Sequence, residues 1–263
     1  MSKETFLKVE NLSISFGGIM ALRNISFEVK KGEIYSIIGP NGAGKTTVFN
    51  CITGIYKPDS GSIFFKDEDI TFLRPYEVAK KRISRTFQNI ELFTHMTTMD
   101  NLMLGRHIHM KTGVWNGATF LSKNSKAAKE EIQHRRKVEE IIDFLELQSA
   151  RNQYVINLPY GTRKLVELGR ALALEPELIL LDEPSAGMNI EEKADLMFSI
   201  QDIRDELGIT ILLVEHDMNL VMDISDRILV LNFGEKIAEG LPKDIQKDHE
   251  VLKAYLGEDK DLA

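Results

Sequence analysis

Eight consecutive residues near the start of the chain have the types and spacing of a phosphate-binding loop. They fit the pattern G-x-x-x-x-G-K-[ST] and read Gly39-Pro40-Asn41-Gly42-Ala43-Gly44-Lys45-Thr46. Glycines let backbone N–H groups approach phosphate oxygens, and a helix that starts here adds a partial positive charge. Lys45 adds a full charge between the outer phosphates, and the Thr46 hydroxyl is placed to bind Mg²⁺. The pattern predicts a site for a nucleoside triphosphate, which we extend to Thr47.

The residues on either side of this loop support that interpretation. Residues 33–38 form a short apolar run typical of a buried strand, and residues 47–52 continue with apolar positions at helical spacing. A strand, a glycine loop and a helix therefore follow one another in the order that gives the pattern its physical meaning.

Acidic residues follow a second apolar run far along the chain. Residues 178–181 are wholly apolar and are followed by Asp182 and Glu183. Ligands of open parallel sheets bind at the carboxyl ends of the strands. We therefore predict that Asp182 holds Mg²⁺ and that Glu183 lies near the attacking water. A third apolar run, residues 209–214, precedes His216, which is placed to reach the γ-phosphate; a single histidine at such a position is more often structural.

Composition limits the class of protein. The chain has 263 residues, 43% of them hydrophobic, which suffices for one domain or for a core with a subdomain. Its 33 basic and 40 acidic residues give a net charge of −7, without a basic run that could follow a phosphodiester backbone, so we expect no nucleic-acid partner. The single cysteine, Cys51, excludes an intrachain disulfide and is interpreted as a small core residue. No apolar stretch is long enough to predict a membrane span.

The pattern of strands and helices changes along the chain. Residues 6–38 and 62–65 alternate as antiparallel strands do, and residues 83–87 form a core strand that ends at Gln88. Residues 99–174 have helical periodicity, and strands alternate with helices again from residue 178. We predict an α/β fold: a P-loop NTPase core with a parallel sheet, an N-terminal antiparallel β subdomain and a helical insert.

Taken in order, these residues resemble the ATP-binding subunit of an ATP-binding-cassette (ABC) transporter over nearly the whole chain. The resemblance identifies the glycine loop as Walker A, the second acidic run as Walker B, Gln88 as the Q-loop residue and His216 as the switch histidine. Phe16 takes the aromatic position that stacks on adenine; its other interpretation is a core strand residue. The resemblance implies one ABC ATP-binding domain over residues 1–263, with a helical subdomain at about 89–175 inserted in a RecA-like core.

The family's signature sequence L-S-G-G-Q is altered in this chain, which has Leu158-Pro159-Tyr160-Gly161-Thr162 instead. The missing serine removes a hydroxyl that the family directs at the γ-phosphate of the opposite subunit. Backbone N–H groups and the helix N-terminus must then make that contact. Residues 185–189 resemble the D-loop, with Asn189 where many members have Asp.

The resemblance also implies a mechanism and partners. Two ATPase subunits, either copies of this chain or this chain and a paralogue, sandwich two ATP molecules. Thr46, Gln88 and Asp182 hold Mg²⁺, while Glu183, His216 and Gln88 act on the water and the γ-phosphate. The other partners are membrane permease subunits and, indirectly, an extracytoplasmic solute-binding protein. The expected location is peripheral, on the cytoplasmic face of the inner or plasma membrane.

Within the family, the chain most resembles the ATPases of branched-chain amino-acid importers. Three features carry this resemblance: Phe16-Gly17-Gly18, the long insert around residues 107–136 and the ending Ala254-Tyr255-Leu256-Gly257. Urea or amide importers and lipopolysaccharide exporters are similar. A different class is the soluble ABC protein of DNA repair or translation, which usually carries two cassettes, long coiled coils or basic surfaces.

Soft apolar side chains follow Gln88 closely in the sequence. Phe93, Met96, Met99 and Met103 are predicted either to receive a short helix of a permease or to pack inside the helical subdomain.

Overall fold

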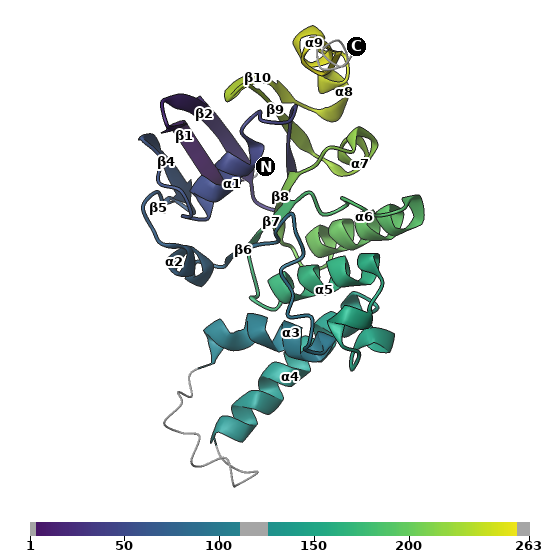
Figure 1. Cartoon of the computed structure of the whole chain (residues 1–263). Coiled ribbons are helices and arrows are strands. Elements are labelled where there is room, and N and C mark those ends of the chain that lie inside the picture. Colours follow the sequence, from purple (N-terminus) through teal and green to yellow (C-terminus); the bar gives the residue numbers. More distant parts are fainter. Residues whose placement is uncertain (1–3, 111–125, 257–263) are drawn as a thin grey trace.

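The computed structural model describes residues 4–110 and 126–256, and it contains two sheets (Figure 1). The first is antiparallel and has the strand order β2-β1-β4-β5. Its strands are β1 (Thr5–Phe16), β2 (Ile19–Lys30), β4 (Ser60–Phe65) and β5 (Glu68–Asp69). The predicted N-terminal antiparallel subdomain is confirmed.

The second sheet has the order β10-β9-β3-β8-β7-β6. Its strands are β3 (Ile34–Ile38), β6 (Ile83–Arg85), β7 (Leu178–Asp182), β8 (Thr210–Val214), β9 (Arg227–Asn232) and β10 (Glu235–Gly240). All neighbours pair in parallel except β9 and β10, which pair antiparallel. The carboxyl ends of β3, β8, β7 and β6 therefore meet at one edge of the sheet.

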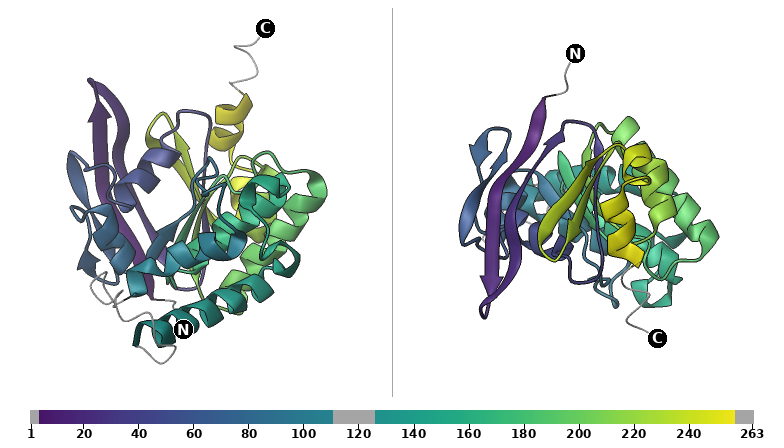
Figure 2. Two further views of the ribbon diagram at one scale, coloured as in Figure 1. Left: turned by 60° about the horizontal axis from the view of Figure 1, so that its bottom comes forward. Right: turned by 90° about the horizontal axis from the view of Figure 1, so that it is seen from above.

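Helices cover both faces of the parallel sheet (Figure 2). Helix α1 (Lys45–Ile52) follows β3, and α2 (Pro75–Lys80) precedes β6. The segment between β6 and β7 contains α3 (Thr98–Gly105), α4 (Lys126–Phe144) and α5 (Tyr160–Leu172), with short 3₁₀ turns at Arg106–His109, Gln148–Ala150 and Val155–Asn157. The later helices are α6 (Ile190–Asp205), α7 (Met218–Ile224), α8 (Pro242–Ile245) and α9 (His249–Leu256). Within the described ranges, no helix is long and apolar enough to cross a bilayer.

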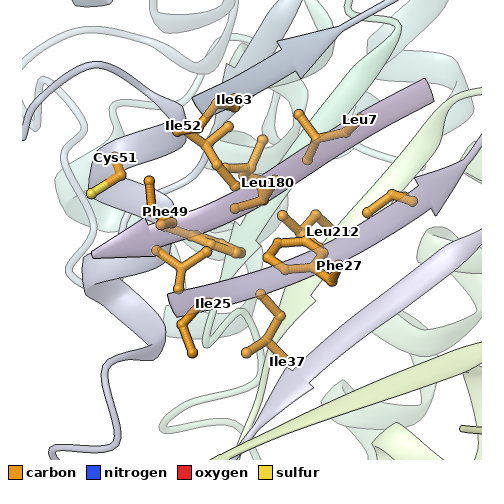
Figure 3. Close-up of a cluster of buried hydrophobic side chains, with 14 of the residues drawn as sticks. Leu7, Ile25, Phe27, Ile37, Phe49, Cys51, Ile52, Ile63, Leu180 and Leu212 are labelled. Atoms are coloured by element: carbon orange, nitrogen blue, oxygen red, sulfur yellow. The ribbon is translucent and has the colours of Figure 1, made fainter. Parts of the chain in front are cut away.

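Two hydrophobic clusters explain why the central strands are apolar throughout. On one face, Leu178 and Leu180 belong to the cluster that packs around α1 between the two sheets (Figure 3). On the other face, Ile179 and Leu181 belong to the cluster that contains buried residues of α5 and α6. A parallel strand buried on both faces has no solvent-exposed position for polar residues. Cys51 of α1 is buried in the first cluster, as predicted, and burial raises the pKa of its thiol to about 12.

Some element boundaries differ from those expected. Strand β1 begins at Thr5, and its pairing with β2 has a register shift between Val9 and Leu12, where Asn11 has a positive φ of 49°. The strand predicted at 83–87 ends at Arg85. Residues 111–125 of the insert and Gly257 of the C-terminal ending lie outside the described residues.

The segment after Gln88 divides into exposed and buried side chains. Met99 is only 5% exposed and belongs to the core cluster shared by the helices and the sheet, whereas Phe93 is 58% exposed. Met96 and Met103 are half-buried. Met99 is therefore a packing residue of the helical segment, and only the Phe93 ring in this group is open to a partner.

We expect Met99→Glu to destabilise the protein by about 3 to 5 kcal/mol, because it leaves an uncompensated charge in the core. Phe93→Glu is the matched control in the same segment and should change stability by no more than about 0.5 kcal/mol. Thermal or urea unfolding of the two variants measures this difference. Equal melting temperatures would show that Met99 is not a core residue.

Candidate functional site

The glycine loop connects β3 to α1, and its backbone requires glycine at two positions. Gly39 has a φ of 148°, and a Cβ there would lie 2.0 Å from the carbonyl oxygen of Leu231. Gly44 has a φ of 102°, and its Cβ would lie 2.6 Å from a methyl carbon of Leu22. Both positions are strained and blocked for any side chain. Strands β2 and β9 thus leave space only for glycine at these two positions, which restricts the conformation of the loop.

The loop and the start of α1 concentrate positive charge. The buried Lys45 ammonium group donates hydrogen bonds to the carbonyl oxygens of Gly39 (2.7 Å) and Pro40 (2.9 Å), so it lies across the loop. The first turn of α1 contains no acidic residue, and no side chain caps its N-terminus. The backbone N–H groups and the helix dipole are therefore available to an anion.

A cavity of about 270 Å³ lies against this loop and brings together residues distant in sequence. It is lined by Ala21, residues 41–47, Gln88, Glu183 and His216. Most of the predicted nucleotide-binding residues, and all three residues predicted to act on water and γ-phosphate, therefore share one cavity. Gly39, Pro40, Phe16 and Asp182 do not line it.

The Glu183 carboxylate is held at both oxygens. Gln88 Nε2 donates to Glu183 Oε2 (2.8 Å), and His216 Nε2 lies 2.7 Å from Glu183 Oε1. Glu183 also has a positive φ of 48°, one of nine such values at non-glycine positions among the described residues. The ends of β6, β7 and β8 thus meet at this carboxylate.

Asp182 is buried beside Glu183 and paired with Arg85. Arg85 Nη2 lies 2.6 Å from Asp182 Oδ2, and both side chains are buried. Burial raises the pKa of Asp182, while the hydrogen bond and charge of Arg85 oppose that shift. Asp182 Oδ1 is buried without a hydrogen-bond partner among the described residues. A buried carboxylate oxygen without a hydrogen-bond partner among the described residues is the kind of ligand that Mg²⁺ prefers, and the carboxylate belongs to the residue next to Glu183, which lines the cavity with Thr46 and Gln88.

Sequence reasoning missed two residues that organise this site. Arg85 neutralises Asp182, and the buried Glu215 accepts hydrogen bonds from the backbone N–H groups of Ser185 (2.8 Å) and His216 (3.0 Å). Glu215 thereby ties the loop after β7 to the loop after β8. In the sequence, both residues can be recognised as charged residues at or just after the carboxyl end of a strand.

Phe16 lies at the end of β1 and is 44% exposed, so its ring is not enclosed in the core. It makes an edge-to-face contact with Tyr56, with ring centroids 5.0 Å apart. A ring supported on one side and open on the other suits stacking with a planar base.

The altered signature sequence opens α5 and lies apart from the cavity. Leu158 is buried, Pro159 precedes the helix, and no side chain caps its N-terminus. The Tyr160 ring packs against Gly187, where an added Cβ would lie 3.0 Å from ring atom Cε1. Gly161 and Thr162 follow in the first turn, which carries no acidic residue. Asn189 caps α6 through reciprocal hydrogen bonds with Glu192, a role that Asp can also fill.

Comparison with known proteins decides the family. The family model described as "ABC transporter" matches residues 22–186, and a second, described as "Branched-chain amino acid ATP-binding cassette transporter", matches residues 235–261. The high-affinity branched-chain amino acid transport ATP-binding protein LivG of Escherichia coli is 42% identical over 255 residues, which cover 97% of this chain and 99% of LivG. This chain belongs to the ATP-binding subunits of ABC transporters.

Solved structures agree with the fold of the ABC cassette. The ADP conformation of an ATP-binding cassette of an ABC transporter superposes with a TM-score of 0.83 at 34% identity, covering 97% of this chain and 99% of that chain. A dimeric cassette in a post-hydrolysis state, bound to ADP and phosphate, gives a TM-score of 0.74 at 27% identity and covers 90% and 98%. The predicted ABC ATPase fold is confirmed.

We expect Phe16→Ala to weaken binding of ATP by about 1 to 3 kcal/mol, the scale of base–aromatic stacking, and Phe16→Tyr to have a small effect. Phe72→Ala removes another exposed ring and serves as the control. Titration calorimetry with MgATP measures the dissociation constants. An unchanged constant for Phe16→Ala would remove the ring from the nucleotide site.

Proposed function

We propose that this chain is the ATP-hydrolysing subunit of an ABC importer that takes up branched-chain or other hydrophobic amino acids. Hydrolysis is supported by the position of the Glu183 carboxylate. Gln88 and His216 bind its two oxygens, and it lines the same cavity as the phosphate loop. The amino-acid substrate is supported by the function of LivG, a branched-chain amino acid transport protein, and by the match of residues 235–261 to the family model of branched-chain amino acid cassettes.

The binding step uses the loop and α1. Residues 39–47 bind the triphosphate through backbone N–H groups, and Lys45 turns from the loop carbonyls to the β- and γ-phosphates. Phe16 stacks on the adenine ring. Thr46, Gln88 and Asp182 would hold Mg²⁺, which would neutralise part of the phosphate charge.

The chemical step uses the ends of β6, β7 and β8. Glu183 orients the attacking water and accepts its proton, and general-base catalysis of this kind depends on a correctly placed carboxylate. Gln88 and His216 fix that carboxylate through its two oxygens, and His216 also holds the γ-phosphate. Arg85 favours the ionised form of the buried Asp182 by pairing with it and so opposes the rise in pKa that burial causes.

A second cassette, either a copy of this chain or a related ATPase, completes each site. Helix α5 begins at Tyr160 after Pro159, whose side chain makes no capping hydrogen bond, and the helix dipole there suits the γ-phosphate of the opposite subunit. The dimeric relative bound to ADP and phosphate supports this arrangement.

The helical segment at about 89–175 is proposed as the subdomain that contacts the permease, with the exposed Phe93 as one contact. The permease subunits place the chain on the cytoplasmic face of the inner or plasma membrane. An extracytoplasmic solute-binding protein supplies the amino acid and meets this chain only through them.

We expect Glu183→Gln to bind MgATP but to hydrolyse it roughly 10²-fold or more slowly, the range for loss of a general base. Glu206→Gln changes an exposed carboxyl at the end of α6 and should leave hydrolysis unchanged. Steady-state phosphate release and nucleotide titration measure both properties. Near-normal turnover by Glu183→Gln would exclude Glu183 as the base.

We expect deletion of the gene to abolish high-affinity uptake of radiolabelled leucine by the cells that carry it. The wild-type gene should restore uptake and Lys45→Ala should not, because the P-loop ammonium group is needed to bind the phosphates. Uptake of an unrelated sugar is the control. Normal leucine uptake after deletion would contradict the amino-acid assignment, and loss of uptake of a different solute would identify the true cargo.

A further inference from the structure

Three charged side chains of α5, spaced one helical turn apart, form hydrogen bonds with the backbone of the segment that contains Gln88. Lys164 Nζ donates to the carbonyl oxygen of Gln88 (3.0 Å), and Glu167 Oε1 accepts from the backbone N–H of Phe87 (3.4 Å). Arg170 donates from Nη1 to the carbonyl oxygen of Glu91. Residues three apart share a helix face, so the three contacts form one row.

The first two of these charged residues, Lys164 and Glu167, lie on a buried face of α5, where apolar side chains are expected. Lys164 is 4% exposed and Glu167 is 2% exposed. Buried charges are costly unless they are paired and hydrogen-bonded, and replacing such a pair with apolar residues often stabilises a protein. Burial raises the pKa of the Glu167 carboxyl, and the charge of Lys164 opposes that shift. An ionic row at this position therefore indicates a requirement other than stability.

The row connects two parts of the proposed site. The backbone of Gln88 is bonded to Lys164, and its side chain donates to Glu183 Oε2 (2.8 Å). The same helix begins at Tyr160, one turn before Lys164, with the residues proposed to meet the nucleotide of the opposite subunit. These contacts form a connected path from the start of α5 through Lys164 and Gln88 to the Glu183 carboxylate.

We propose that Lys164, Glu167 and Arg170 form a clasp that positions Gln88 against Glu183, so that docking of a second cassette at the N-terminus of α5 sets the orientation of the hydrolytic carboxylate. These three are positioning residues, because they act through Gln88 and do not touch the nucleotide. The inference rests on the proposed ATPase function and adds a route by which the two halves of the site act together.

A double-mutant cycle between Lys164 and Gln88 tests the clasp. Lys164→Met keeps the apolar stem and removes the donor to the Gln88 carbonyl. We expect it to lower kcat for ATP hydrolysis about tenfold, the order of loss that small misplacements of reacting groups cause, with KM for ATP unchanged. In a Gln88→Ala background the same substitution should change kcat by less than about twofold, because the group it positions is gone. Lys164→Arg should retain most of the wild-type kcat.

Arg106→Met is the matched control, because Arg106 is also a buried cation that donates to a backbone carbonyl, that of Ala173 (2.8 Å). We expect it to lower the melting temperature as Lys164→Met does, to leave kcat of the folded protein near wild type and to add independently to Gln88→Ala. Arg170→Gln, at a half-buried position, repeats the cycle if Lys164→Met does not fold.

Equal loss of kcat from Lys164→Met in the wild-type and Gln88→Ala backgrounds would overturn the clasp, and so would the same result for Arg170→Gln. A wild-type chain that does not hydrolyse ATP would instead overturn the proposed function. The two failures are thus distinguishable from one set of rate measurements.

Discussion

The parallel pairing of β3, β8, β7 and β6 is the constraint on which the rest of the site depends. Asp182 pairs in register with Val214, and Ile37 of β3 pairs with the same residue. This register places the phosphate loop, the acidic pair, Gln88 and His216 at one edge of the sheet, although they come from distant parts of the chain. The sheet therefore sets the positions of the site residues, and the loops that follow its strands provide most of the reactive side chains.

The buried charges follow from the same constraint. Strands covered on both faces carry their charged groups at or just beyond their carboxyl ends, where Arg85, Asp182 and Glu215 are buried and paired with side chains or backbone N–H groups. Such pairs contribute little to stability relative to apolar packing. Their concentration at the edge proposed to bind nucleotide is consistent with the proposed role of this part of the fold in hydrolysis.

The sequence predicted the fold and most of the cavity, because its signals are local. The glycine loop and the acids after an apolar run depend on neighbours within a few residues, and the family resemblance ordered them. Met99 shows the limit: its soft side chain suited an interface or a core, and only tertiary packing placed it in the core. The contacts of Lys164 and Glu167 could not be predicted from the sequence either, because their partners are backbone groups about eighty residues away. The roles assigned to the site residues, among them Phe16, the signature residues and the metal ligands, remain predictions.

The most direct measurement is a structure of the wild-type chain with Mg²⁺ and a non-hydrolysable ATP analogue. The account predicts that the triphosphate lies on residues 39–47, that Thr46, Gln88 and Asp182 bind the metal, and that the Glu183 carboxylate faces the γ-phosphate. A nucleotide bound elsewhere, or a metal held by other carboxylates with Glu183 turned away from the γ-phosphate, would contradict it.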